Sequence, residues 1–190
     1  MQFSTAEKAL FLKIVYYGPG LGGKTTNLEL IHARTKPELR GKLISLATES
    51  ERTLFFDLLP VELGKFKGYD IRLHLCTVPG QIAQEQTRRL VLRHVDGIVF
   101  VVDSQPSRLE ENVESIRNLE TNLMMQGDDP DRMPLVVQYN KRDLPTAVSI
   151  EEMDGGGRHG DTHRLAYTDR GATRDAKGNF GALGMRHEDD

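Results

Sequence analysis

The chain has 190 residues, of which 28% are charged, and its formal net charge is −3. This near balance excludes the broad basic field with which proteins attract nucleic acid or an anionic membrane surface. The polar N-terminus, the absence of an apolar run near about 18 residues and the single cysteine, Cys76, predict no signal peptide, membrane span or disulfide framework. We therefore expect one cytoplasmic domain.

The first predicted elements are a buried strand at 11–17 and a helix at 24–34, joined by a glycine-rich turn. The turn, Gly18-Pro19-Gly20-Leu21-Gly22-Gly23-Lys24-Thr25, matches the phosphate-loop pattern G-x-x-x-x-G-K-[ST] between a strand and a helix. Such a loop directs successive N–H groups and a helix N-terminus at one anion. Lys24 is expected to reach the β- and γ-phosphates, and the Thr25 hydroxyl to ligate Mg²⁺. The predicted nucleotide contacts here are Gly18, Gly20, Gly22, Gly23, Lys24, Thr25 and Thr26.

Strands and helices alternate in the chain that follows. A hairpin turn at Lys67-Gly68 joins the first two predicted strands, and Ser107 with Glu110 predicts a capped helix start after Pro106. The predicted strands are 54–66, 69–78, 97–103 and 135–139, and the predicted helices are 84–94 and the segment after 106. This order predicts a doubly wound α/β domain that binds its ligand at the carboxyl edge of the sheet.

A second motif, Asn140-Lys141-Arg142-Asp143, follows the last of these strands. The Asp143 carboxylate can accept hydrogen bonds from N1–H and the 2-amino group of guanine, two donors that adenine does not present together. Asn140 can brace the loop, and the Lys141 stem can lie along the ring face. A simple helix-entry turn is the alternative interpretation, but the position behind a phosphate loop favours guanine binding.

These motifs resemble the MglA type of bacterial small GTPases in the Ras superfamily, over about residues 10–153. Four segments carry the resemblance, namely 16–28, 45–57, 77–81 and 140–143. The resemblance implies a P-loop NTPase with a Ras-like, mostly parallel sheet, with Mg²⁺ as the cofactor and GTP and GDP as substrate and product. It also implies an MglB-like homodimeric activator and polarity or motility effectors as protein partners.

The resemblance further implies catalytic roles for Lys24, Arg52, Thr53 and Gln81. Thr53 would close on Mg²⁺ and the γ-phosphate, and Arg52 would be an arginine finger supplied within the chain. Gln81 would orient the attacking water, and the Gly80 N–H would contact the γ-phosphate. These roles fit phosphoryl transfer, which requires charge neutralisation and an in-line water. An ion pair with a neighbouring glutamate is the alternative for Arg52.

Two features depart from most Ras-like proteins. Thr77 stands where they carry the aspartate of D-x-x-G, which braces the Mg²⁺ shell, although the MglA-type pattern shows the same threonine. Residues 154–190 contain no Val or Ile and eight Gly, so they predict no final strand, guanine loop or closing helix. We therefore expect a GTPase domain at 10–153 and an atypical tail at 154–190, disordered or produced by a shifted reading frame. One face of the strands at 11–17 and 97–103 should then stay partly uncovered.

The function predicted from these features is a molecular switch that hydrolyses GTP slowly and controls cell polarity or motility. Three alternatives remain open. The protein could be a GTP-bound scaffold with negligible turnover, which Gln81 and Arg52 disfavour. It could be a P-loop ATPase or small-molecule kinase, which Asn140 and Asp143 disfavour. It could also be a non-functional product of the altered C-terminal end.

Overall fold

The structure is a computed structural model that describes residues 2–5, 7–46, 56–80 and 84–155. Its strands in chain order are β1 (Gln2–Ser4), β2 (Ala9–Tyr17), β3 (Ile44–Leu46), β4 (Phe56–Phe66), β5 (Tyr69–Thr77), β6 (Gly97–Asp103) and β7 (Leu135–Asn140). Its helices are α1 (Lys24–Arg34), α2 (Glu85–Leu92), α3 (Leu109–Met125) and α4 (Ile150–Gly155), with short 3₁₀ turns η1 (Pro37–Leu39) and η3 (Pro106–Arg108).

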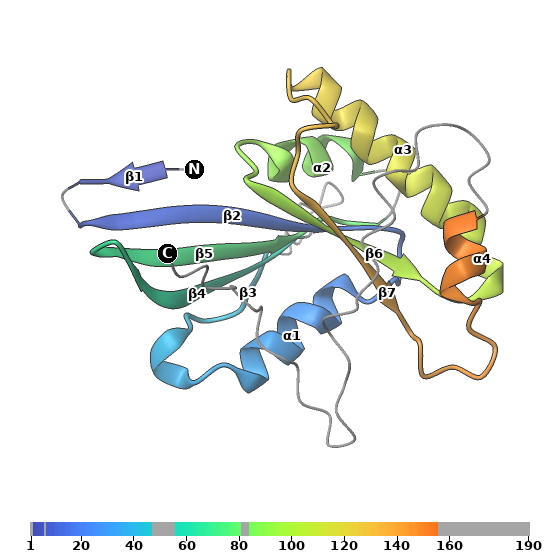
Figure 1. The fold of residues 1–190 in the computed structure, drawn as a ribbon, viewed down its shortest axis with the longest axis horizontal. Coiled ribbons are helices and arrows are strands. Elements are labelled where there is room, and N and C mark those ends of the chain that lie inside the picture. The colour runs from blue at the N-terminus through green and yellow to red at the C-terminus, as the bar shows by residue number, and fades with distance from the viewer. Residues whose placement is uncertain (1, 6, 47–55, 81–83, 156–190) are drawn as a thin grey trace, which may run out of the picture.

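All seven strands form one sheet in the order β3-β4-β5-β2-β6-β7, with β1 paired to β2 (Figure 1). The pairs β2–β5, β2–β6 and β6–β7 are parallel, whereas β4 is antiparallel to both β3 and β5. The β4–β5 hairpin turns at Lys67 and Gly68, with φ values of 49° and 83°, as tight hairpins require. The predicted doubly wound, mostly parallel fold is confirmed.

Helices cover both faces of this sheet, α1 on one side and α2 and α3 on the other (Figure 1). The alternation of side chains along β2 divides its residues between two cores. Val15 and Tyr17 belong to the core beneath α2 and α3, and Tyr16 packs with Leu28 of α1 on the opposite face. The carboxyl ends of β2, β6 and β7 therefore meet at one edge, from which the functional loops emerge.

Some details differ from the sequence predictions. The cap at Ser107 does not form: the chain makes the 3₁₀ turn η3, and α3 begins at Leu109 without a side-chain cap. The strands β1 and β3 and the helix α4 were not predicted, because each is too short to show a period.

The sheet face that carries α1 is partly exposed at the β7 side. Val136 is 49% exposed, and its register partner Val99 is half-buried. Val136 lies on β7, whereas the predicted uncovered face concerned the strands at 11–17 and 97–103, so that expectation stays a prediction. The tail prediction itself concerns 154–190, of which 156–190 lie outside the described residues. Within the described part of the chain, no helix is long and apolar enough to cross a membrane.

Candidate nucleotide-binding site

The phosphate loop leaves the carboxyl end of β2 and closes on the N-terminus of α1. Gly23, the residue before α1, has a φ of 95°, and a Cβ there would lie 2.3 Å from Asn140 Nδ2. Gly80 approaches the same loop, because a Cβ on it would lie 2.3 Å from the Gly20 Cα. Only glycine fits these two positions. The fold thus places the predicted Gly80 directly against the phosphate loop.

Lys24 lies within this loop and is only 6% exposed. Its Nζ donates to the carbonyl oxygens of Gly18 at 3.0 Å and Pro19 at 2.7 Å. Burial, with a smaller contribution from nearby Arg88, lowers the pKa of Lys24 to about 8. An anionic phosphate beside this ammonium would favour its charged form and offset the cost of burying it.

The Thr25 hydroxyl donates to a carboxylate that the sequence did not single out, Asp57 on β4, at 2.7 Å. Asp57 is 8% exposed. It also accepts hydrogen bonds from the hydroxyls of Thr77 at 2.9 Å and Ser45 at 2.7 Å. The backbone N–H of Asp57 donates in turn to the Thr77 hydroxyl at 2.9 Å. Thr77 therefore orients, through hydrogen bonds, a carboxylate that the neighbouring strand supplies.

This oxygen-rich cluster fits Mg²⁺, a hard cation that prefers carboxylate, hydroxyl and water ligands. Thr25 supplies the predicted hydroxyl, and Asp57 supplies a buried carboxylate beside it. Thr53, the other predicted metal ligand, lies outside the described residues. The sequence signal for Asp57 was a single acidic residue in the apolar run 54–61, one strand away from Thr77.

The guanine motif follows β7 and contacts the phosphate loop. Asn140 Nδ2 donates to the Gly22 carbonyl at 2.8 Å. Lys141 Nζ donates to Asp103 Oδ2 at 2.6 Å, a partner that the sequence did not predict. The Asp143 side chain is exposed at the same end of the sheet. The two predicted motifs are thus adjacent, although more than a hundred residues separate them in the chain.

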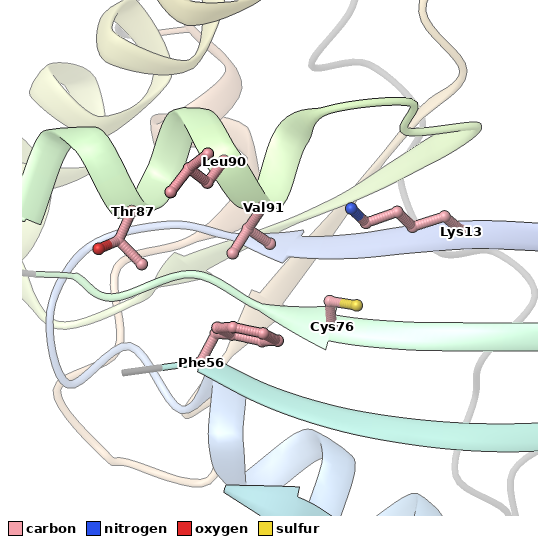
Figure 2. Close-up of a pocket in the computed structure, with 6 residues that line it drawn as sticks. All are labelled: Lys13, Phe56, Cys76, Thr87, Leu90 and Val91. Carbon is pink, nitrogen blue, oxygen red and sulfur yellow. The ribbon is translucent and has the colours of Figure 1, made fainter. Parts of the chain in front are cut away.

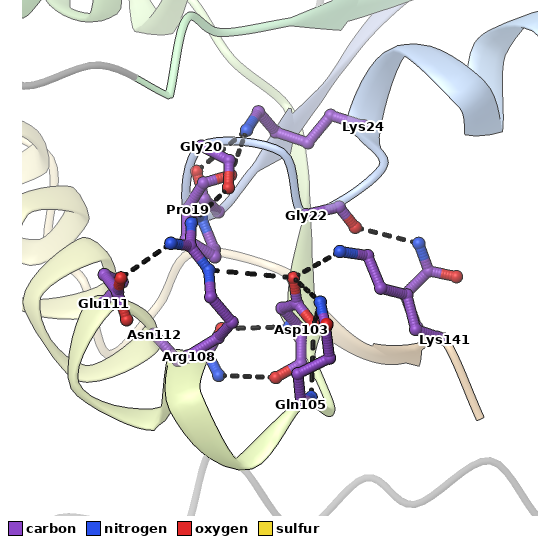
Figure 3. A network of polar contacts seen from close by, with 12 residues as sticks. Pro19, Gly20, Gly22, Lys24, Asp103, Gln105, Arg108, Glu111, Asn112 and Lys141 are labelled. Atoms are coloured by element: carbon purple, nitrogen blue, oxygen red, sulfur yellow. Dashed lines mark hydrogen bonds and ion pairs between the residues drawn. The ribbon is translucent and has the colours of Figure 1, made fainter. Parts of the chain in front are cut away.

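Asp103, at the end of β6, lies between Lys141 of the base loop and the guanidinium of Arg108. It is fully buried, and it accepts hydrogen bonds from Lys141 and Gln105. Burial alone would raise the pKa of Asp103, but these hydrogen bonds outweigh it and hold the pKa below its ordinary value. Figure 3 shows Arg108 between this carboxylate and the phosphate loop, where its Nη2 donates to the Gly20 carbonyl at 2.6 Å.

The described residues thus bring together the predicted phosphate loop, Gly80 and the Asn140–Asp143 motif. Arg52, Thr53 and Gln81, on which the predicted turnover depends, lie outside the described residues. The histidines of the tail, His159, His163 and His187, lie outside them too. Within the described segments, no group of three His, Cys, Asp or Glu side chains could hold a metal.

A separate hollow of about 160 Å³ lies between α2 and the sheet (Figure 2). Its lining residues are Lys13, Phe56, Cys76, Thr87, Leu90 and Val91. Cys76 is buried, and burial raises the pKa of its thiol. This confirms the buried thiol expected from the sequence, and α2, which follows Gln81 in the chain, forms one wall of the hollow.

The sequence profile of the ADP-ribosylation factor family matches residues 6–158. The chain belongs to this family. Its relatives include the mutual gliding-motility protein MglA of Myxococcus xanthus (strain DK1622), 60% identical over 141 residues that cover 74% of this chain and 72% of that protein. The small COPII coat GTPase SAR1 of Giardia intestinalis is 29% identical over 74% of this chain and 63% of its own length. The ADP-ribosylation factor-like protein 4D of Mus musculus is 30% identical over 75% of this chain and 64% of its own length.

Membership of the ADP-ribosylation factor family, with the likeness to MglA, makes the chain an MglA-type small GTPase. Small GTPases bind GTP and GDP, typically with Mg²⁺, and hydrolyse GTP. The resemblance inferred from the four sequence segments is confirmed.

Proposed function

We propose that the protein is a cytoplasmic switch that alternates between GTP and GDP and hydrolyses GTP slowly. The observation that supports it most directly is the 2.8 Å hydrogen bond from Asn140 to the Gly22 carbonyl. This bond joins the guanine motif to the phosphate loop, so that one nucleotide can contact both. Gly18, Gly20, Gly22, Gly23, Lys24, Thr25, Thr26 and Gly80 would bind the phosphates, and Asn140, Lys141 and Asp143 the base.

Isothermal titration calorimetry of the full chain with GDP and ADP in Mg²⁺ tests this proposal. A site built around paired acceptors should prefer GDP by about 10⁴-fold or more, because ADP would leave the Asp143 carboxylate unpaired. Equal binding of the two nucleotides would contradict the guanine assignment. Binding of neither would contradict the switch itself, and would favour the alternative of a non-functional product.

Thr25 and Thr53 would ligate Mg²⁺, with Asp57 as the nearby carboxylate in place of the aspartate of D-x-x-G. The bound ion would neutralise charge on the β- and γ-phosphates. The hydrogen bonds that Asp57 accepts from Thr25, Thr77 and Ser45 hold its carboxylate in one orientation. This orientation is what a carboxylate requires when it fixes metal-bound water.

Turnover in this proposal depends on Lys24, Arg52, Thr53 and Gln81. Lys24 would hold the transferred phosphoryl group, Arg52 would neutralise the charge that develops on it, and Gln81 would place the attacking water. Intrinsic hydrolysis should be on the order of 10⁻⁴ to 10⁻² per second, as for switch GTPases acting alone. A scaffold with negligible turnover is the alternative, and single-turnover hydrolysis of bound GTP distinguishes the two.

The partners in this proposal come from the likeness to MglA, whose name describes a mutual gliding-motility protein. We propose an MglB-like activator that positions Arg52 and Gln81, and effectors that control motility or cell polarity. Stimulation of GTP hydrolysis by purified MglB would support this role, and a lack of stimulation would contradict it.

The switch domain in this proposal comprises residues 10–153, followed by a tail at 154–190 that does not pack as a helix on the sheet. Limited proteolysis with and without GDP tests this division. Cleavage should concentrate in the tail and leave a GDP-protected fragment. Protection that extends through 160–190 would contradict the division.

A further inference from the structure

Arg108 connects the start of α3 to the phosphate loop, although 88 residues separate it from Gly20 in the chain. Its side chain is 26% exposed. The guanidinium is held at both ends: Nη1 donates to Glu111 Oε1 at 2.7 Å, and Nη2 donates to the Gly20 carbonyl at 2.6 Å. In Figure 3, Arg108 and Lys24 approach the loop from different directions.

The bond to Gly20 fixes the orientation of one peptide group in the loop. The C=O and N–H of a trans peptide point in opposite directions. Because the Gly20 carbonyl points at Arg108, the N–H of the same peptide, which belongs to Leu21, points away from Arg108. A phosphate loop binds its anion through N–H groups turned inward. The orientation of this peptide therefore decides whether the loop offers a donor or a carbonyl oxygen to the phosphates.

The backbone conformation of Leu21 is strained, and a flip of the Gly20–Leu21 peptide would relieve this strain. Its φ is 59°, in the left-handed region that only glycine adopts without strain. Its side chain is 88% exposed, so little packing holds it in place. The hydrogen bond from Arg108 to Gly20 is charge-assisted, and such bonds are about twice as strong as neutral ones.

We propose that Arg108 is a positioning residue for the nucleotide phosphates, which holds the Gly20 carbonyl outward and keeps the Leu21 N–H turned toward them. Glu111 Oε1 lies 2.7 Å from Nη1, and Asp103 Oδ2 lies 3.9 Å from Nε. These two carboxylates neutralise the guanidinium, so its direct field on the phosphates is small. The inference rests on the proposed nucleotide binding, and it adds a residue that neither sequence motif contains.

The test measures GDP dissociation from the full chain. A fluorescent GDP derivative is bound in Mg²⁺ and chased with excess GDP, for the unchanged protein and for Arg108→Ala, Arg108→Lys and Arg117→Ala. Arg117 is an exposed arginine on the same helix and serves as the matched control. Arg108→Ala should release GDP about tenfold faster or more, because a hydrogen bond to a charged group is lost. Arg108→Lys should release it at least threefold faster, since one ammonium cannot replace both ends of the guanidinium. Arg117→Ala should stay within twofold.

A double-mutant cycle with Leu21→Gly separates positioning from a general structural role. Glycine adopts the left-handed conformation freely, so the loop depends less on Arg108. In the Leu21→Gly background, Arg108→Ala should speed GDP release less than threefold. A residue that merely stabilised the start of α3 would give the same factor in both backgrounds, and that result would overturn the proposal.

A rate for Arg108→Ala within twofold of the unchanged protein would also overturn it. If circular dichroism shows that Arg108→Ala is unfolded, Arg108→Lys decides: release within twofold rejects the proposal, and release threefold faster supports it. The preference for GDP over ADP should not change in either variant, because the base loop keeps its contacts. Failure of the unchanged protein to bind GDP would refute the proposed function, whereas normal binding with unaffected variants would refute only the role of Arg108.

Discussion

Replacement of Asp57 by Asn tests whether its carboxylate serves Mg²⁺. The amide has nearly the same shape, so the substitution removes the charge while it keeps one oxygen acceptor for the hydroxyls of Thr25, Thr77 and Ser45. Because Asp57 is only 8% exposed, solvent screens its charge little in the folded protein. The expected effects therefore fall on Mg²⁺ dependence and, to a lesser degree, on stability.

The magnitude of both effects follows from the contacts of Asp57. Changes to groups that orient metal ligands typically cost 10- to 100-fold in metal affinity, which corresponds to about 1.4–2.8 kcal/mol. A hydrogen bond to a charged acceptor contributes about 1 kcal/mol more than one to a neutral acceptor. Loss of the charge from the three side-chain hydrogen bonds should thus lower the free energy of unfolding by about 3 kcal/mol, which a domain with typical stability survives.

The assay is the rate of GDP release as a function of free Mg²⁺. Asp57→Asn should raise the Mg²⁺ concentration that halves the release rate by about tenfold or more. Asp70 is an acidic residue at the exposed end of β5, and Asp70→Asn is the matched control. This control should leave the half-maximal Mg²⁺ concentration unchanged. The exchange Asp57→Thr with Thr77→Asp moves the carboxylate to the adjacent strand and should recover most of the Mg²⁺ dependence. An unchanged Mg²⁺ curve for folded Asp57→Asn would refute the assignment.

Three further predictions concern the base, turnover and protonation. Asp143→Asn should lower the affinity for GDP and raise the affinity for xanthosine diphosphate, because the 2-oxo group of xanthine needs a hydrogen-bond donor. Calorimetry with both ligands checks this, and unchanged GDP affinity would contradict it. Arg52→Ala and Gln81→Leu should each keep GDP binding but lower activator-stimulated GTP hydrolysis about 10³-fold or more, measured by phosphate release. A normal stimulated rate in either variant would reject the hydrolytic role of the residue replaced. GDP binding should take up nearly one proton at pH 9 and far less at pH 7, because free Lys24, with a pKa of about 8, is largely neutral at the higher pH and the phosphates recharge it. Calorimetry in buffers of different ionisation enthalpy measures this uptake, and equal values at the two pH values would contradict it.

The sequence predicted the order of strands and helices because each main element carries its own period or apolar run. The β6 segment, Gly97–Asp103, is a continuous apolar stretch, and the phosphate loop has a fixed spacing within a few residues. These signals are local, so no tertiary contact is needed to recognise them. The start of α3 was predicted less well: the Ser107 cap competes with a 3₁₀ turn in the same segment, and the turn forms.

The missed site residues depend on contacts between distant parts of the chain. Asp57 acquires its meaning only when β4 pairs with β5 and places its carboxylate on Thr77, 20 residues away. Arg108 contacts Gly20 across 88 residues, and Asp103 meets Lys141 across 38. A charged residue in or after an apolar strand signals that a partner exists, but the topology of the sheet decides which partner it is.

The phosphate loop is held from three sides by these contacts. Asp57 bonds to Thr25, Asn140 bonds to Gly22, and Arg108 bonds to Gly20. A loop fixed in this way loses little conformational entropy when it binds phosphate, so more of the interaction energy remains for affinity. Apart from Lys24, which lies in the loop itself, the residues proposed for hydrolysis belong to other segments, since Arg52 and Thr53 precede β4 and Gln81 precedes α2. Changes to the three braces should therefore alter how tightly nucleotide is held, whereas changes to the hydrolytic residues should alter how fast it is consumed. The proposed activator would then accelerate hydrolysis by positioning Arg52, Thr53 and Gln81, without loosening the three braces.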